Sequence, residues 1–338
     1  MKRSVAALMM ALLCLCAALA AADARPMTKY APGQKIDIGW GEDVRFIAGC
    51  ELDDGSTMML IDTDLADGYL LVDAPAYAFD TITLGMPIPD GSWSASVTAE
   101  DLQHCSVVFR KGDETRELHY AYEYTEQGVD EWVLKRYGLR NENGDCFTAE
   151  LSLFRAELSE SKGGKTQTAV VYYDFFRQAN NITYPKHPYS IRECRALQEK
   201  YPVAAVSPED PTTRVNLREG PGTDYPRCGS LYAGALFSIY EMEDGWAKIR
   251  VGDTDAYIST QFLAFGEDIE NVPDMRPTAR VRDGEWIEVS RVPYRGGGGS
   301  VSRTRGGQEV RIMGEYNSQW RIVSANPGSY YIHADNLR

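Results

Sequence analysis

Cysteine, histidine and serine are the side chains that most often act as nucleophile and base, so their spacing is a first test for catalysis. His104 and Cys105 are adjacent. Their surroundings predict a strand, in which neighbouring side chains point to opposite faces and cannot react together. Cys146 follows the turn-forming pair Asn143-Gly144, so we expect it to begin a strand and to pack there. The sequence has no G-x-S-x-G and no H-E-x-x-H motif, and we predict no catalytic residues and no enzyme activity.

Acidic and sulfur side chains could hold a metal ion. Asp62, Asp64 and Asp67 precede Gly68 in an arrangement like a calcium-binding loop. Such a loop needs an oxygen ligand at its fifth position, which here is Ala66, so a solvated turn is the favoured interpretation. The cysteines are widely and irregularly spaced without a C-x-x-C pair, which argues against zinc. We predict no metal and no cofactor.

The composition is that of a folded chain of two or three domains. It has 338 residues, of which 43% are hydrophobic and 25% charged. Asp and Glu total 49 against 35 Lys and Arg, a net charge of −14. Because phosphate contacts need clustered basic side chains, we expect no nucleic-acid binding.

The first 24 residues predict a signal peptide. Lys2 and Arg3 precede an apolar run from Val5 to Ala22, and the stretch 22–24 has the small-x-small form of a cleavage site. We therefore expect cleavage after Ala24, a secreted or envelope location and no stable membrane span thereafter. Export permits disulfides, although an odd number of cysteines then remains and their pairing is open: Cys50, Cys105, Cys146, Cys194 and Cys228.

Residues 25–201 predict an antiparallel β-rich domain whose role the sequence leaves unassigned. Alternating or apolar runs indicate strands over 106–111, 118–124, 132–139, 146–158 and 168–176, with a turn at Gly163-Gly164. The tyrosines of this meander suit core packing better than a sugar-stacking surface. Ser190 and Glu193 form a capping box for a short helix over 190–201.

Pro-containing stretches at 202–213 and about 266–277 predict two linkers. Between them, residues 205–265 contain Val215-Asn216-Leu217-Arg218, a Gly220-Pro221-Gly222-Thr223 loop before Tyr225, then Trp246-Ala247-Lys248-Ile249 and Tyr257-Ile258. Short strands and glycine turns favour a small barrel, with Gly220 and Gly222 expected to supply tight-turn backbone angles. The block resembles the bacterial SH3 (SH3b) domain, with Ala256 where that family usually has glycine.

The last block, 278–338, repeats this spacing. Trp246 and Trp320, Tyr257 and Tyr331, and Leu263 and Leu337 are each 74 positions apart. We predict a second, degenerate SH3-like barrel whose first loop is replaced by a glycine-rich segment. Its nine arginines outnumber six acidic residues and predict a basic area: Arg280, Arg282, Arg291, Arg295, Arg303, Arg305, Arg311, Arg321 and Arg338.

The predicted architecture is thus mainly β, with an N-terminal domain followed by two small barrels. The SH3b resemblance implies an exported bacterial, non-catalytic protein whose barrels bind cell-wall peptidoglycan or short peptides and target the N-terminal domain. The alternatives are an envelope adaptor with a protein partner, or a cell-wall hydrolase with an unrecognised N-terminal site. Asp145-Cys146 resembles NlpC-type peptidases, but Phe147-Thr148 follow where that family has serine and a small residue.

The resemblance places a ligand groove on the first barrel, because a small barrel has no deep pocket. Aromatic walls and a few polar groups make such grooves selective. The four residues predicted to bind a ligand are Arg218, Tyr225, Trp246 and Tyr257. Packing is the alternative for the three aromatic residues, and most strongly for Trp246.

Overall fold

The structure is a computed structural model, and it describes residues 24–39, 43–63, 68–74, 77–84, 88–101, 103–124, 130–152, 154–174, 188–284, 286–293, 301–325 and 328–338. The protein is mainly β with several antiparallel sheets, as predicted. The apolar run of the predicted signal peptide and two aspartates of the calcium-like loop, Asp64 and Asp67, lie outside the described residues. Within the described ranges, no helix is long and apolar enough to cross a membrane.

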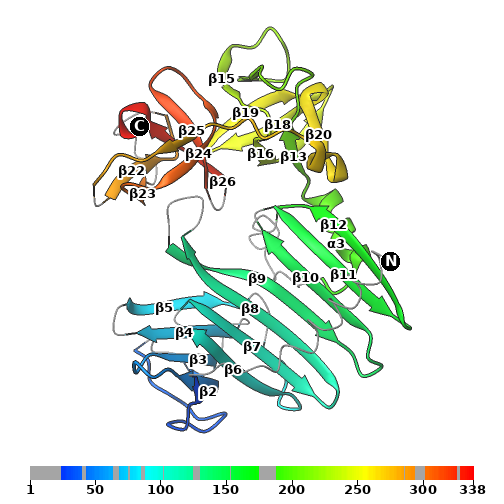
Figure 1. Ribbon diagram of the computed structural model, residues 1–338, viewed down its shortest axis with the longest axis vertical. Helices are drawn as coiled ribbons and strands as arrows, with labels where there is room; N and C mark the ends of the chain where they lie inside the picture. The colour runs from blue at the N-terminus through cyan, green and yellow to red at the C-terminus, as the bar shows by residue number, and fades with distance from the viewer. Residues whose placement is uncertain are drawn as a thin grey trace, which may run out of the picture.

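The N-terminal domain contains two antiparallel sheets, drawn in blue to green in Figure 1. The first has five strands in chain order: β1 (Arg25–Pro26), β2 (Arg45–Glu51), β3 (Thr57–Asp62), β4 (Gly68–Ala74) and β5 (Tyr77–Thr83). The second is a seven-stranded meander: β6 (Ser94–Asp101), β7 (His104–Lys111), β8 (Glu114–Tyr124), β9 (Asp130–Arg140), β10 (Cys146–Ser152), β11 (Arg155–Lys162) and β12 (Lys165–Tyr172).

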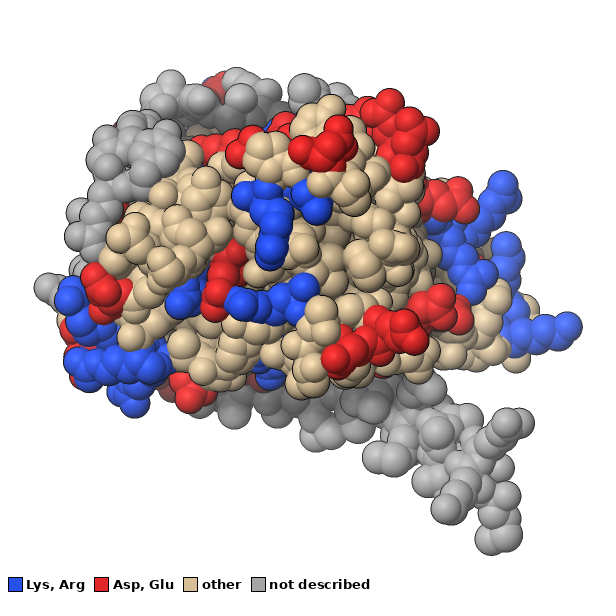
Figure 2. Space-filling model, turned by 90° about the horizontal axis from the view of Figure 1, so that it is seen from above, with Lys and Arg blue, Asp and Glu red and all other residues tan. Residues whose placement is uncertain are grey.

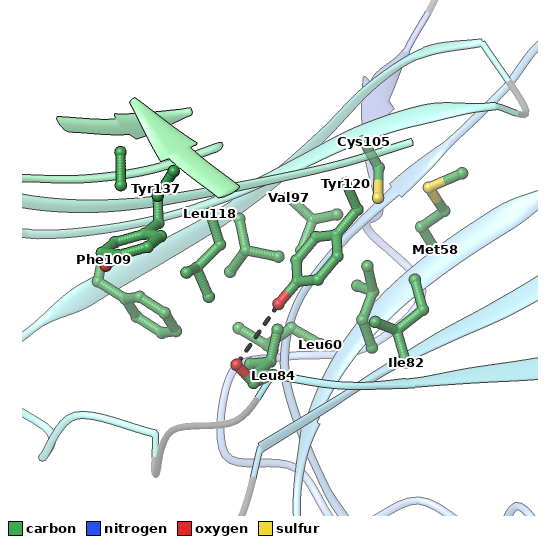
Figure 3. Close-up of a cluster of buried hydrophobic side chains, with 14 of the residues drawn as sticks. Met58, Leu60, Ile82, Leu84, Val97, Cys105, Phe109, Leu118, Tyr120 and Tyr137 are labelled. Atoms are coloured by element: carbon green, nitrogen blue, oxygen red, sulfur yellow. Dashed lines mark hydrogen bonds between the residues drawn. The ribbon is translucent and has the colours of Figure 1, made fainter. Parts of the chain in front are cut away.

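The main core of this domain lies between the two sheets. Figure 3 shows side chains such as Leu60 and Ile82 from the five-stranded sheet meeting Val97 and Leu118 from the meander. Tyr120 is buried among them, and its hydroxyl donates to the carbonyl of Leu84 at 3.5 Å. For Tyr120 the prediction of core packing is therefore confirmed.

The helix α3 (Ile191–Lys200) packs against β11 and β12, the last strands of the meander. Ser190 caps it by accepting the amide of Glu193 at 3.2 Å, while the Glu193 carboxylate accepts the amide of Tyr189 at 3.0 Å. Ile191 and Cys194 are buried in the main core. The capping serine and the apolar helix face are confirmed, whereas the Glu193 carboxylate bonds to the amide of Tyr189 and not to that of Ser190 as a capping box requires.

The single long strand predicted over 146–158 is wrong. The chain reverses between β10 and β11, where Ser152 pairs with Arg155. Phe154 has φ 60° in this tight turn. Aromatic residues rarely adopt a positive φ. The sequence at this turn also lacks the glycine, asparagine or proline by which turns are usually recognised. The unbroken alternation of apolar residues concealed it.

The linker predicted over 202–213 is also wrong in its first part. β13 (Val203–Val206) lies between β16 (Leu236–Ser238) and β20 (Leu263–Phe265) in a three-stranded sheet. All four residues of β13 are buried. The three prolines and two alanines of residues 202–213 favour a connection, but small apolar residues also suit a strand covered on both faces. In the second predicted linker, Ile269 of the 3-10 helix η2 (Gly266–Asn271) is buried.

The rest of the first barrel, called here the SH3 unit, contains five further strands and a short 3-10 helix. They are β14 (Val215–Arg218), β15 (Arg227–Leu231), β17 (Glu241–Glu243), β18 (Trp246–Val251), β19 (Thr254–Ser259) and η1 (Thr260–Phe262). β18 pairs with β17 and β19, and β19 also pairs with β14. The central strands of the block therefore form where the sequence predicts them.

Residues 278–338 form a second set of strands, called here the C-terminal unit. They are β21 (Thr278–Arg280), β22 (Trp286–Ser290), β23 (Val301–Arg305), β24 (Glu309–Glu315), β25 (Trp320–Ala325), β26 (Gly328–His333) and the 3-10 helix η3 (Ala334–Asn336). β15 of the SH3 unit pairs with β24, so that one sheet runs through both units. Figure 1 shows the two units side by side above the N-terminal sheets.

Candidate ligand-binding face of the SH3 unit

Strand alternation decides which side chains of β18 and β19 face the solvent. Ala247 and Ile249 on β18 and Ile258 on β19 are buried in the core of the unit. Residues of the opposite parity, Trp246, Lys248 and Tyr257, therefore point outward and are half-buried. We call this surface, together with Arg218, the outer face.

Three of its side chains form a row across neighbouring strands. Arg218 on β14 lies directly opposite Tyr257 on β19, which lies directly opposite Lys248 on β18. Side chains of directly opposed residues project from the same face about 4.5–5.5 Å apart. Trp246 belongs to the next row, opposite Ser259. It is thus on the same face as Lys248 and not in the core.

The loop between β14 and β15 carries the fourth predicted residue. Tyr225 is 44% exposed. Its ring lies against Gly220 and Gly222: a Cβ on Gly220 would overlap the ring, and one on Gly222 would lie 3.2 Å from its Cδ2 atom. The amide of Gly222 donates to the carbonyl of Gly220 at 3.0 Å, so the segment is a tight turn as expected, but neither glycine has a positive φ. These positions need glycine because the aromatic ring lies close to the backbone.

Arg218 holds this loop closed. Its Nη1 atom donates to the carbonyl of Tyr225 at 2.6 Å. This hydrogen bond connects the end of β14 to the far side of the loop and fixes the position from which the ring of Tyr225 extends. The sequence indicated a cation beside the loop but not this contact. Because a guanidinium has five N–H donors, the others remain capable of binding a carboxylate.

The outer face also contains charged residues that the prediction omitted. Asp255 accepts from Lys248 Nζ at 2.7 Å and from Arg250 Nε at 3.2 Å. The hydrogen bond from Lys248 lowers the pKa of Asp255, and the same bond raises the pKa of Lys248. Counting in steps of two along β18 from Trp246 and along β19 from Tyr257 would have found Lys248 and Asp255. The face thus combines aromatic rings with cationic groups, which can bind a peptide that carries carboxylates.

The predicted basic area of the C-terminal unit is described only in part, because Arg295 and the side chains of Arg303 and Arg305 lie outside the described residues. Carboxylates lie within ion-pair distance of five of its arginines: Arg280, Arg291, Arg311, Arg321 and Arg338. Figure 2, which views the molecule from above in the orientation of Figure 1, shows basic and acidic side chains close to one another on this side. At these five arginines the local positive charge is therefore smaller than the arginine count alone suggests.

The adjacent residues His104 and Cys105 lie on opposite faces of their strand. His104 is exposed and Cys105 is buried, as expected for neighbours on β7. Cys146 begins β10, and its thiol donates to the carbonyl of Gly144 at 3.3 Å. All five cysteines after residue 24 are free thiols in this structure. No group of three or more potential metal ligands occurs among the residues that the structure describes.

One polar cluster on the meander was missed by sequence reasoning. Ser106 Oγ lies 2.7 Å from His119 Nδ1, and His119 Nε2 lies 3.5 Å from a carboxylate oxygen of Glu117. The imidazole lowers the pKa of Glu117, against the effect of burial. Glu117 and His119 are two residues apart on β8 and therefore share a face, and Ser106 lies opposite His119 on β7. In the sequence, this cluster was indicated only by Ser106 and by the spacing of Glu117 and His119.

The backbone of Ser106 differs from that of a nucleophile beside an oxyanion hole. Ser106 is paired on both sides, with Thr98 on β6 and His119 on β8. Its backbone is therefore part of the sheet ladder, whereas an oxyanion hole needs N–H groups that are free to bind a developing negative charge. The arrangement suits a cross-strand hydrogen-bond network better than a nucleophile.

Comparison with known proteins agrees with the interpretation of the SH3 unit. Residues 213–264 match the bacterial SH3 domain family. No curated protein matches the chain. Among solved structures, NlpC2 from Trichomonas vaginalis is similar at 18% identity with a TM-score of 0.20. The similarity covers 41% of this chain and 48% of that one, so it spans about half of the NlpC2 chain.

Proposed function

We propose that this is an exported bacterial protein without catalytic activity, which binds a short peptidoglycan peptide on the outer face of its SH3 unit. Bacterial SH3 domains commonly bind peptidoglycan. The observation that carries the proposal is the row Arg218–Tyr257–Lys248 beside the exposed ring of Tyr225. Peptidoglycan stem peptides are short and carry carboxylates, so cations and aromatic rings in this order suit them.

The two cations would have different roles in this binding. Arg218 is already bound to the loop carbonyl of Tyr225 and positions the aromatic wall. Lys248 bonds to Asp255, so a ligand carboxylate would compete with that residue for the ammonium group. The ring of Tyr257 lies between the two cations and would contact the apolar part of the peptide. Affinity would thus come from a few contacts on an open surface, and moderate binding is expected.

The N-terminal domain would be carried to the wall by this binding. An apolar cluster joins it to the SH3 unit, with Phe154 and Tyr172 from one side and Val203, Ala205 and Ile269 from the other. Such a buried connection holds the two parts in one orientation, unlike a flexible tether. The proposal is therefore that the N-terminal domain is presented in a fixed position relative to the wall.

Polar contacts reinforce the same connection. Glu270 accepts from the hydroxyl of Tyr172 at 2.7 Å and from Arg155 Nε at 3.0 Å. These two bonds, that from Tyr172 first, lower the pKa of Glu270. Asp174, which is buried, bonds to the hydroxyl of Ser238. Orientation is thereby specified as well as proximity.

The test is binding of the full mature chain to purified peptidoglycan sacculi and to a stem tetrapeptide, measured by sedimentation and calorimetry. Tyr257→Ala and Lys248→Ala should weaken both by about tenfold, since each removes a contact of about 1.4 kcal/mol. Arg192→Ala, an exposed change on α3, is the control and should bind normally. Normal binding by both face variants would refute the site, and failure of the unmodified protein to bind wall material would favour the adaptor alternative.

A further inference from the structure

The C-terminal unit repeats the strand register of the SH3 unit. On β18 and β19, Trp246 lies opposite Ser259 and Lys248 opposite Tyr257. On β25 and β26, Trp320 lies opposite His333 and Ile322 opposite Tyr331. Every pair is displaced by 74 residues. Positions can therefore be compared one by one between the two strand pairs, and the same parity identifies the same face.

The face equivalent to the outer face has a different character in the C-terminal unit. Trp320 and Tyr331 keep the aromatic residues, but Ile322 stands where the SH3 unit has Lys248. Trp246, Lys248 and Tyr257 are half-buried, whereas Trp320, Ile322 and Tyr331 are 7%, 1% and 2% exposed. The unit's own core is on the opposite face and includes Val323 and Ile332. Both faces of this strand pair are thus buried.

The cover of this second face is the SH3 unit itself. Trp320, Ile322, Tyr331 and Met313 belong to the same buried cluster as Leu217, Leu231 and Ile258 of the SH3 unit. Tyr316 packs edge-on against Tyr331, with ring centroids 5.6 Å apart. The C-terminal unit therefore extends the core of the SH3 unit rather than resting on its polar surface.

Backbone contacts make this docking specific. Leu231 on β15 pairs with Gly314 on β24, where an added Cβ would lie 2.7 Å from a methyl carbon of Leu231. The amide of Gly252, in the β18–β19 turn, donates to the carbonyl of Ser329 at 2.9 Å. Gly252 has φ +57°, and a Cβ there would overlap the backbone of Arg291. Two glycines thus allow the close approach of the two units.

Polar side chains at the margin complete the contact. Arg291 lies 3.4 Å from Asp253. Glu315 pairs with Arg214 and accepts from the hydroxyl of Tyr232 at 3.2 Å. One arginine of the predicted basic area, Arg291, thus contacts the neighbouring unit.

We infer that the C-terminal unit is an intramolecular docking module: the face that corresponds to the proposed ligand face is the surface with which it completes the core of the SH3 unit. The two units then form one folded body with a single open outer face, and each chain binds one ligand. The stoichiometry rests on the proposed function, whereas the docking does not.

Hydrogen exchange on the full mature chain tests the docking with a matched pair of variants. Trp320→Ala removes a docked ring, and Trp246→Ala removes the equivalent outward ring. With Trp320→Ala, amides of β18 and β19 should exchange about a hundredfold faster or more, because loss of a buried aromatic side chain opens the shared core. Amides of β7 and β8 in the N-terminal domain should be unchanged. With Trp246→Ala, exchange throughout should remain as in the unmodified chain.

A second pair covers the case in which Trp320→Ala does not fold. Ile322→Lys introduces the residue type of its equivalent position, and a buried unpaired ammonium should separate the units and speed exchange in β15 and β24. Lys248→Ile is its control and should leave that exchange unchanged. Unchanged exchange at the interface in both docked-face variants would overturn the docking. Calorimetry with a stem tetrapeptide should give one site per chain, and two equivalent sites would overturn the single open face. No binding at all would refute the proposed function and leave the exchange result valid.

Discussion

The ring of Tyr225 occupies the space that a side chain on Gly220 would need. The Gly-Pro-Gly segment and the tyrosine after it are therefore one steric unit, in which the glycines let the ring lie against the backbone. Gly220→Ala should displace the ring and cost about 1–3 kcal/mol of stability, the usual effect of overpacking. It should also weaken stem-peptide binding. Denaturant unfolding and calorimetry on the same samples measure the two effects.

Gly91→Ala is the control for this substitution. Gly91 has no positive φ, and nothing lies within 4 Å of an added Cβ. The free energy of unfolding of Gly91→Ala should differ from that of the unmodified protein by less than about 0.5 kcal/mol, as for ordinary surface substitutions. Equal stability of Gly220→Ala and Gly91→Ala would show that Tyr225 does not lie on the loop backbone.

Arg218 is predicted to act through the loop as well as on the ligand. Arg218→Lys keeps the charge but cannot both reach the carbonyl of Tyr225 and present a planar fork to a carboxylate. We expect Arg218→Lys to weaken binding nearly as much as Arg218→Ala. The tyrosine fluorescence or NMR signal of Tyr225 should shift in both. Full retention of binding in Arg218→Lys would mean that only the charge matters.

The sequence allowed prediction of those elements whose local signals agree with their surroundings. The α3 helix had a capping serine and one apolar face, and it forms as expected. The central strands of the SH3 unit had alternation and glycine turns. The register repeat of 74 residues was visible because aromatic residues stand at both ends of it.

Other features depend on contacts between distant residues and left no local signal. The turn at Phe154 lacks the usual turn residues. The sequence of β13 resembles a linker, and its strand character depends on pairing with β16 and β20. The docking of the C-terminal unit follows from a change of Lys248 to Ile322 between repeats, but periodicity does not say which surface an apolar face will bury against. The binding residues were predicted from a family resemblance, whereas the hydrogen bond from Arg218 to the carbonyl of Tyr225 is visible only in the structure.

The loop after β13 gives a prediction about limited proteolysis. Glu209 is exposed, and a glutamate-specific protease should cut there early. β13 remains on the N-terminal fragment but pairs with β16 and β20 of the other fragment. The two fragments should therefore elute together in size-exclusion chromatography and separate only in denaturant. Separate elution under native conditions would show that residues 203–206 act as a linker after all.

Thiol reactivity should distinguish the five cysteines. Cys146 is half-exposed, whereas burial raises the pKa of Cys50 and of Cys228 to about 11 and that of Cys194 to about 12. Because the thiolate is the reactive form, iodoacetamide at pH 8 should modify Cys146 first. Mass spectrometry of native and unfolded samples measures this order. Faster labelling of Cys194 than of Cys146 would contradict the buried helix packing.

The same thiols predict alkaline destabilisation. Their folded pKa values lie above the unfolded value of about 8.5. Their contribution to stability is therefore complete below about pH 8.5 and is lost as the pH rises through about 11–12. Urea midpoints should fall between pH 8.5 and pH 11. The urea midpoint of Cys194→Ala should fall less over this pH range than that of the unmodified protein. An identical fall would assign the loss of stability to other groups.

The cluster of Ser106, His119 and Glu117 decides between the binding protein and the hydrolase alternative. Because the backbone of Ser106 is committed to the sheet, we expect no turnover of muropeptides or of activated esters. Ser106→Ala should leave chromatograms of wall digests unchanged and cost about 1 kcal/mol of stability through the lost cross-strand hydrogen bond. Cys146→Ala is tested in parallel as the other candidate nucleophile. New muropeptides that disappear in either variant would establish a hydrolase and refute the non-catalytic function.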